Sequence, residues 1–562
     1  MRRRRHTARL ALPDLLRLLT QPEYPLVPVP AATQNGATVS QPSLVPAPAH
    51  LTVGDGRAFA LAGDVALVMA TDAEALSDAA AELRRLIAAR TGIHLPPPTP
   101  ADGGRRQIRL SLDHDGPAES YRLRSDADAV HVAGADAAGL FYGVQTLAQA
   151  ITADASGWGV PAMEIEDAPR FAYRGVMLDV ARHFLDVATV CGYIDRAAGL
   201  KFNVLHLHLT DDQGWRIEMH SRHRLTERAA TSSVGADGGG FYTHDDYRAI
   251  VAYAGRRHMV VVPEIDGPSH THAVSLAYPE LCAPPVISAQ LQQQAEQDGT
   301  DLPVSGVAYE GIGVGFSSLR IRDEQTYTFL ADVLTELAAL TPGPYLHIGG
   351  DEALGTDADD YDHYIERVSR LVVETGKTAI AWHEAGVSGR VAEGTVGQYW
   401  GFVSPTDGMD EKTRGFVRRG GRVILSPADA IYLDMKFDPD SPLGLTWARG
   451  VTSARRAYEW EPTAVIDGID ETQILGVEAP LWSETARTPA DIDALAFPRI
   501  AAAAEAAWSP AWESLPLRTW ESFRSRVGGL GPLWTALGIR FTALPEIEWT
   551  PMEAITARGD TT

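Results

Sequence analysis

The adjacent carboxylates Asp351 and Glu352 are the residues of this sequence best suited to acid/base chemistry. They follow a short apolar run and two glycines, Gly349 and Gly350, which permit backbone angles that other residues avoid. Successive residues of a strand point to opposite faces, so both carboxylates can face one pocket only if the chain turns here. Two nearby carboxylates disfavour each other's ionisation, which raises the pKa of one of them. A carboxyl group that stays protonated near neutral pH can serve as a general acid.

Tryptophans and charged residues follow several other apolar runs, and this combination favours a sugar as the ligand. Pyranose rings stack their C–H faces on aromatic rings, whereas carboxylates and arginine bind hydroxyl groups in pairs. Small-molecule sites typically combine an aromatic lining with a few placed polar groups. Besides the Asp351–Glu352 pair, the candidate site residues are Arg182, Asp211, His270, Trp382, Trp400, Tyr432, Asp434, Trp447, Trp482 and Glu484.

These residues must be positioned by short apolar runs that alternate with amphipathic segments from about residue 166 onward. Helix signals lie between the runs: Thr243 and Asp246 resemble a capping box, and Gly376 fits a helix C-terminus. The alternation predicts an α/β fold, a (β/α)8 TIM barrel, whose active site is built from the C-terminal ends of the strands. The expected strands are Gly175–Val180, Val204–Leu209, Val260–Ile265, Tyr345–Ile348, Thr378–Trp382, Val396–Trp400, Val423–Ser426 and Ile474–Glu478.

The chain divides into four parts. Residues 1–50 form a proline-rich lead-in, 51–165 a smaller α+β accessory domain, 166–545 the catalytic barrel, and 546–562 a C-terminal tail. Within the accessory domain we expect strands at Val65–Ala70, Gln107–Leu112 and Ala129–Val132, and helices at Ala73–Ala89 and Asp136–Ile151.

Composition limits the possible partners. The net charge of −24 argues against nucleic acid, because a phosphate-binding surface needs clustered lysine and arginine. No stretch reaches the roughly 18 apolar residues that span a bilayer, so a membrane partner is not expected. The N-terminus is a poor secretion signal, which favours a cytoplasmic enzyme, with secretion as the alternative. The two cysteines lack metal-ligand spacing, and we expect no metal and no cofactor.

Five segments in conserved order resemble the family-20 glycoside hydrolases, the β-N-acetylhexosaminidases, over roughly residues 50 to 545. These segments are Arg174–Phe184 (RGVMLDVARHF), His206–Trp215 (HLHLTDDQGW), His347–Glu352 (HIGGDE), Gln398–Gly401 (QYWG) and Leu425–Lys436 (LSPADAIYLDMK). The resemblance implies an exo-acting, retaining enzyme whose nucleophile is the substrate's own acetamido group, an exception to the usual pair of carboxylates. The implied substrate is an oligosaccharide or glycoconjugate.

The resemblance also implies roles for the candidate residues. Glu352 matches the general acid/base, Asp351 the carboxylate that orients the acetamido N–H, and Tyr432 the hydroxyl that binds the acetamido oxygen. The remaining matches are Arg182, Asp434 and Glu484 for sugar hydroxyls, Trp382, Trp400 and Trp482 for the walls, Trp447 for the +1 unit, and Asp211 with His270 for a relay behind Glu352.

Two features depart from the family pattern: the loop Asp266–His270, and a long segment at 285–311 that could line the aglycone side or form a surface insertion. A metal-dependent amidohydrolase stays open as a rival because His206 and His208 resemble a two-histidine metal pair. A non-catalytic sugar-binding protein and a disaccharide-releasing or transglycosylating enzyme are further alternatives. The preferred hexosamine and the oligomeric state, monomer or homodimer, are also left open.

Overall fold

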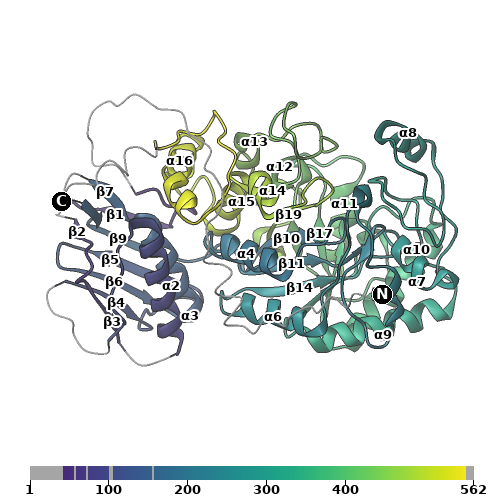
Figure 1. The fold of residues 1–562 in the computed structure, drawn as a ribbon, viewed down its shortest axis with the longest axis horizontal. Coiled ribbons are helices and arrows are strands. Elements are labelled where there is room, and N and C mark those ends of the chain that lie inside the picture. The colour runs from purple at the N-terminus through teal and green to yellow at the C-terminus, as the bar shows by residue number, and fades with distance from the viewer. Residues whose placement is uncertain (1–41, 56–57, 71–73, 100–105, 155–156, 552–562) are drawn as a thin grey trace, which may run out of the picture.

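A computed structural model describes residues 42–55, 58–70, 74–99, 106–154 and 157–551. The lead-in expected at 1–50 and the tail expected at 546–562 therefore lie largely outside the described residues. The molecule shows two lobes in Figure 1: a smaller lobe holding the N-terminal sheet, and a larger lobe built around a closed barrel. Within the ranges described, none of the helices combines the length and apolar character that crossing a bilayer requires.

The larger lobe is a closed barrel of eight parallel strands, which confirms the fold class expected from the sequence. Nearly every residue of these strands is buried, because one face lies inside the barrel and the other lies under helices. β10 closes the barrel by pairing with β19, and Tyr173 lies opposite Gly476 in that register. The strands are β10 (Tyr173–Asp179), β11 (Val204–His208), β14 (Val260–Glu264), β15 (Tyr345–His347), β16 (Thr378–Trp382), β17 (Val396–Tyr399), β18 (Val423–Leu425) and β19 (Ile474–Leu481).

Helices surround the barrel in an outer layer (Figure 1). The capping box expected from the sequence is present, since Thr243 and Asp246 bond each other's backbone N–H at the start of one helix. Gly376 follows another helix at a φ of 82°, which a glycine adopts without strain. The main helices are α4 (Val187–Ala198), α6 (His244–Gly255), α9 (Glu324–Leu340), α10 (Ala358–Glu374), α11 (Met409–Arg418), α14 (Pro489–Ala496), α15 (Arg499–Trp508) and α16 (Trp520–Ala536).

The smaller lobe is an α+β unit with a six-stranded sheet in the order β1-β9-β5-β6-β4-β3. Two helices, α2 (Glu74–Thr91) and α3 (Ala137–Ala150), pack on it (Figure 1). Three strands of this sheet were expected and three were not. The expected ones are β3 (Ala66–Met69), β4 (Gln107–Ser111) and β6 (Ala129–Gly134), and the others are β1 (His50–Val53), β5 (Tyr121–Ser125) and β9 (Met163–Asp167).

A buried polar network joins the two lobes. Asp167 of β9 accepts hydrogen bonds from Lys201 Nζ at 3.0 Å, Trp508 Nε1 at 3.0 Å and Tyr121 Oη at 2.7 Å. Lys201 and Trp508 belong to the barrel lobe, whereas Tyr121 and Asp167 belong to the sheet. Removing one partner of such a network leaves a buried charge unpaired, which costs about 3–5 kcal/mol. The lobes are therefore held in one fixed arrangement.

The long segment at 285–311 contains its own helix, α8 (Ala289–Asp298), which stands away from the barrel in Figure 1. Only Leu291 and Ala295 of this helix are buried, and Leu291 packs with Tyr309 and Phe316 in a small separate cluster. Helix α8 thus lies on the surface, whereas the part of the segment that follows it contacts loops at the barrel mouth: Gln213 Nε2 donates to Gly311 O at 2.8 Å, and His272 Nε2 lies 2.8 Å from Val307 O.

Gly476 offers a test of barrel closure. A Cβ atom at this position would lie 1.7 Å from the carbonyl oxygen of Tyr173, inside the β10–β19 pairing. We expect Gly476→Ala to destabilise the fold by about 2 kcal/mol or more, because neither backbone can yield in a packed barrel. Thermal unfolding followed by circular dichroism would measure the change in Tm. Gly389→Ala is the matched control, since a Cβ there meets nothing within 4 Å. Equal Tm values for both variants would contradict the expectation.

Candidate active site

The floor of the candidate site is a buried carboxylate, Glu264, at the C-terminal end of β14. Its two oxygens are met by Trp382 Nε1 at 2.9 Å, His347 Nδ1 at 2.8 Å, His206 Nε2 at 3.0 Å and His208 Nδ1 at 2.5 Å. Burial alone would raise the pKa of Glu264, but the surrounding histidines hold it well below its usual range. The ends of four neighbouring strands are thereby fixed to one charge.

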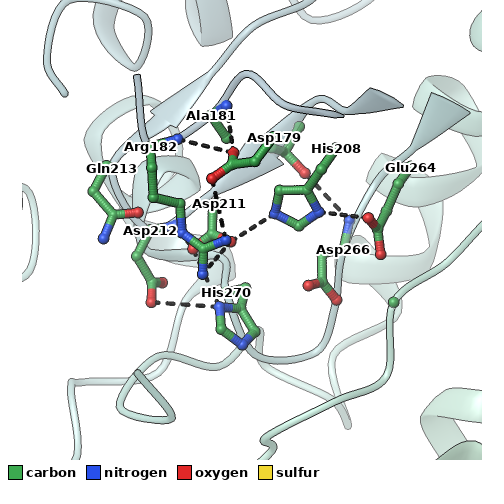
Figure 2. A network of polar contacts seen from close by, with 12 residues as sticks. Asp179, Ala181, Arg182, His208, Asp211, Asp212, Gln213, Glu264, Asp266 and His270 are labelled. Carbon is green, nitrogen blue, oxygen red and sulfur yellow. Dashed lines mark hydrogen bonds and ion pairs between the residues drawn. The ribbon is translucent and has the colours of Figure 1, made fainter. Parts of the chain in front are cut away.

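A chain of alternating acids and imidazoles leads from this floor to the Asp351–Glu352 pair. His208 Nε2 lies 2.6 Å from Asp211 Oδ2, and Asp211 Oδ1 lies 3.1 Å from His270 Nδ1 (Figure 2). The other nitrogen of His270 lies 3.3 Å from Glu352 Oε2 and 3.6 Å from Asp351 Oδ2. Burial opposes a charged imidazole, but Asp211 and Asp351 raise the pKa of His270 well above its ordinary value. The expected relay residues are thus within reach of both carboxylates.

The chain turns sharply between β15 and the Asp351–Glu352 pair. Gly349, Gly350 and Glu352 all have positive φ angles, of 67°, 107° and 47°. Both carboxylates consequently approach the same nitrogen of His270, as the turn inferred from the sequence requires. Asp351 lies deeper than Glu352, whose side chain is 30% exposed. Burial raises the pKa of Asp351 to about 6, and the Glu352 charge adds to this shift while His270 opposes it.

Asp266 supports the turn and was not among the residues expected at the site. Its Oδ1 accepts a hydrogen bond from Gly350 N at 3.2 Å, and a Cβ atom on Gly349 would lie 1.5 Å from the same oxygen. Burial raises the pKa of Asp266 well above its usual range, and the charge of Asp351 adds to the effect. The glycine pair therefore allows the backbone to pass directly over a buried acid.

Arg182 lies on the opposite side of Asp211 from His270. Its Nη2 is 2.9 Å from Asp211 Oδ2, and its guanidinium carbon lies 4.7 Å from the centre of the Trp482 ring. Asp179 accepts the backbone N–H groups of residues 181 and 182 and so shapes the loop that carries this arginine (Figure 2). Burial raises the pKa of Glu484 to about 7, against the lowering effect of Arg182.

Five aromatic side chains run in contact from the floor of the site to its rim. Trp382 and Trp482 have ring centres 6.1 Å apart, and Tyr432 lies 6.4 Å from Trp482 and 5.6 Å from Trp447. Trp400 and Trp447 meet edge to face at 5.9 Å. Exposure rises from 1% at Trp382 to 47% at Trp447. The surface suits a ligand with an apolar ring face buried at one end and open at the other.

Several polar atoms of the charged site residues are buried without a hydrogen-bond partner among the described residues. An unpaired buried polar atom costs about 1–3 kcal/mol, so a folded protein keeps few of them. Where several such atoms belong to one site, a ligand rich in hydroxyl and amide groups could form hydrogen bonds with them. The atoms concerned are Arg182 Nη1, Asp351 Oδ1, Asp434 Oδ2 and Glu484 Oε2.

Glu384 is a further carboxyl of the site that the sequence reading missed. It follows β16 directly and accepts a hydrogen bond from Trp400 Nε1 at 2.9 Å. Burial raises the pKa of Glu384 to about 8, and the charge of Asp351 adds to the shift. This shift favours the protonated form of the carboxyl at neutral pH. Its place two residues after Trp382, at a strand end, was the signal that could have identified it.

The histidine pair that suggested a metal site serves the floor of the pocket. Both ring nitrogens of His206 face carboxylates, Glu264 at 3.0 Å and Glu478 at 2.9 Å. Those of His208 face Glu264 and Asp211. The two imidazoles are thus paired with acids on both sides, which accounts for their spacing without a metal-binding role.

Comparison with known proteins relates both lobes to one family. Residues 171–511 match the model for "Glycosyl hydrolase family 20, catalytic domain", and residues 41–168 match "Glycosyl hydrolase family 20, domain 2". The β-N-acetylhexosaminidase of Cellulomonas fimi is 38% identical, over 90% of this chain and 97% of its own length.

Solved structures agree. A glycoside hydrolase family 20 β-N-acetylglucosaminidase superposes with a TM-score of 0.82 at 58% identity, over 91% of this chain and 100% of that chain. A mutant Streptomyces plicatus β-hexosaminidase, in complex with the product GlcNAc, superposes with a TM-score of 0.81 at 41% identity, over 92% of this chain and 99% of that chain.

The raised pKa of Asp351 predicts a stability effect. The folded-state value of about 6 exceeds the unfolded value of about 3.9, so the folded protein loses stability as pH rises through this window. Asp351→Asn should therefore raise Tm at pH 7.5 by a few degrees, and the gain should vanish near pH 4. Differential scanning calorimetry at both values would test this, with the exposed Asp301→Asn as control. A variant less stable than the wild type at pH 7.5 would contradict the expectation.

The neutral state of Glu384 predicts that an amide can replace it. Glu384→Gln retains an acceptor for the Trp400 N–H, so kcat should stay close to the wild-type value. Glu384→Ala leaves the indole free to move, and a displaced wall should lower kcat about ten- to hundredfold. Steady-state kinetics of both variants would decide, and equal impairment of the two would show that the charge matters instead.

Proposed function

This chain belongs to glycoside hydrolase family 20, and we propose that it releases terminal non-reducing N-acetyl-β-D-hexosamine units with retention of configuration, using the substrate's own acetamido group as nucleophile. The chain is a β-N-acetylhexosaminidase. Its substrate would be an oligosaccharide or glycoconjugate. The GlcNAc bound by the Streptomyces plicatus relative supports a hexosamine in the pocket.

The observation that carries this proposal is the approach of both carboxylates to one nitrogen of His270, at 3.3 and 3.6 Å. Acids that act as nucleophile and proton donor in the usual retaining scheme flank the glycosidic bond about 5–5.5 Å apart. Asp351 and Glu352 both approach one imidazole, so they are placed to act on different groups on the same side of the sugar. Glu352, the more exposed, would act on the leaving oxygen, and Asp351, the deeper, would act on the acetamido group.

The proposed reaction has two steps. The acetamido carbonyl oxygen attacks the anomeric carbon, the glycosidic C–O bond breaks, and Glu352 gives its proton to the departing oxygen. The resulting oxazolinium ion carries positive charge, which the Asp351 carboxylate offsets while Tyr432 Oη binds the acetamido oxygen. Water then attacks the anomeric carbon and passes a proton to Glu352, while the bond between that carbon and the acetamido oxygen breaks, so that the acetamido group and the protonated acid are both restored. Groups placed in advance against developing charge contribute most to such a rate.

The remaining residues would bind the sugar. Arg182, Asp434 and Glu484 each have a buried polar atom with no hydrogen-bond partner among the described residues, and a sugar hydroxyl group could bond to each of them. Trp382, Trp400 and Trp482 would enclose the ring and the acetamido methyl group. Trp447, the most exposed of the aromatic residues, would stack on the +1 unit at the rim. Asp211 and His270 would hold Glu352 in position.

The test compares p-nitrophenyl N-acetyl-β-glucosaminide with the plain β-glucoside, with and without a chelator. Only the acetamido sugar should be cleaved, and chelation should not change the rate. Glu352→Gln should lower kcat by about 10²–10⁴-fold, and Asp351→Asn should also be severe. Near wild-type rates in either variant would refute the assigned roles.

The nucleophile itself can be tested with substrates whose acetamido group carries one, two or three fluorines. Each fluorine weakens the carbonyl oxygen as a nucleophile, so kcat should fall steeply along the series. A flat series would indicate a nucleophile supplied by the protein.

A further inference from the structure

A cluster of histidine and glutamate side chains lies outside the pocket, on the surface of the barrel lobe. It consists of Glu218, His220, His244 and Glu336 and is called here the outer cluster. The first two residues lie in the loop that follows β13 (Gly214–Trp215), the third begins α6, and the fourth lies on α9. We propose that the outer cluster binds one divalent transition-metal ion, of which Zn²⁺ is the type.

The side chains are already arranged around a common point. Ligand atoms of Glu218, His220 and His244 all lie within 4.8 Å of one another. His220 Nε2 is 3.6 Å from Glu218 Oε2, and His244 Nε2 is 3.0 Å from Glu336 Oε1. Bonds of about 2.0–2.2 Å from nitrogen and oxygen to a tetrahedral zinc ion separate neighbouring ligands by little more than 3 Å. Small side-chain rotations would therefore complete the site.

Backbone N–H groups hold the two carboxylate ligands in place. Glu336 accepts hydrogen bonds from His220 N at 2.5 Å and Ser221 N at 3.0 Å, which hold its carboxylate against the loop. Glu218 Oε2 accepts from His244 N at 3.0 Å, so it also caps α6. His244 is 9% exposed and thus fixed, whereas His220 is 67% exposed and free to close onto an ion.

The two imidazoles of the outer cluster lie next to each other, with the rings of His220 and His244 4.0 Å apart, centre to centre. His244 Nε2 also lies 3.0 Å from the backbone oxygen of Glu218, a contact that a metal ion would replace. The two carboxylates balance the charge of the ion. Mixed imidazole and carboxylate ligands suit zinc and its neighbours better than calcium or magnesium.

Binding would connect the loop after β13 to α6 and α9. A ligand that binds only the folded state stabilises it by RT ln(1 + [L]/Kd), so metal would raise Tm. The outer cluster shares no residue with the proposed catalytic machinery. Metal binding and catalysis would therefore vary independently, and the proposal stands apart from the proposed reaction.

The experiment titrates Co²⁺ into tag-free, full-length protein that has been stripped with a chelator and exchanged into chelator-free buffer. We expect one equivalent to give the visible absorption of a four-coordinate site, to be displaced by Zn²⁺, and Zn²⁺ to raise Tm. His220→Ala should lower the affinity at least about tenfold and abolish the Tm shift. His223→Ala, an exposed histidine of the same loop, is the matched control and should bind as the wild type does.

Glu336→Gln provides a second variant, which keeps the acceptor for the loop but removes the charge, and it should also weaken binding. Absence of stoichiometric Co²⁺ binding to the wild type would overturn the proposal. Unchanged affinity in both His220→Ala and Glu336→Gln would do so as well, because the ion would then lie elsewhere.

Discussion

The buried charge of Glu264 is the constraint on which the rest of the site depends. A carboxylate that deep is stable only when hydrogen bonds and opposite charge surround it. Three histidines and one indole supply them, and they come from β11, β15 and β16. Those donors lie at strand ends, so their hydrogen bonds to Glu264 also fix the positions of the neighbouring strand ends at the mouth of the barrel. His208 in turn contacts Asp211, and Asp211 contacts His270, which lies beside Asp351 and Glu352.

Much of the barrel was predictable because its strands are buried on both faces and read as short apolar runs. The antiparallel strands of the smaller lobe were harder, since β5 (YRLRS) alternates buried and exposed residues over only five positions. At the site, the sequence pointed to residues that end strands or resemble the family motifs. Asp266 and Glu384 were not predicted as site residues, because their roles depend on contacts between strands. Asp266 accepts a hydrogen bond from the backbone of the Gly349–Gly350 turn, and Glu384 accepts one from the Trp400 indole. Such contacts appear only in the three-dimensional structure.

Burial of polar groups in the pocket costs free energy of folding, because some of these groups lack hydrogen-bond partners or are buried with like charges. Asp351 has a raised pKa, and buried polar atoms of Asp351, Asp434 and Glu484 have no hydrogen-bond partner among the described residues. The packed floor and the network between the lobes provide the stability that tolerates this. Preorganisation here means that polar atoms of the protein are already placed where a bound sugar could form hydrogen bonds with them.

The network around Asp167 has a consequence for how the molecule moves. A lysine and an indole from one lobe, fastened to a buried acid of the other, leave no hinge between them. The pocket also lies wholly within the barrel lobe, so its opening owes nothing to a gap between lobes. Entry of the sugar and departure of the product therefore rest on the short segments at the barrel mouth, above all the loop that carries Trp447. Movement of loops at the mouth of an active site is a step that can set the turnover number of an enzyme.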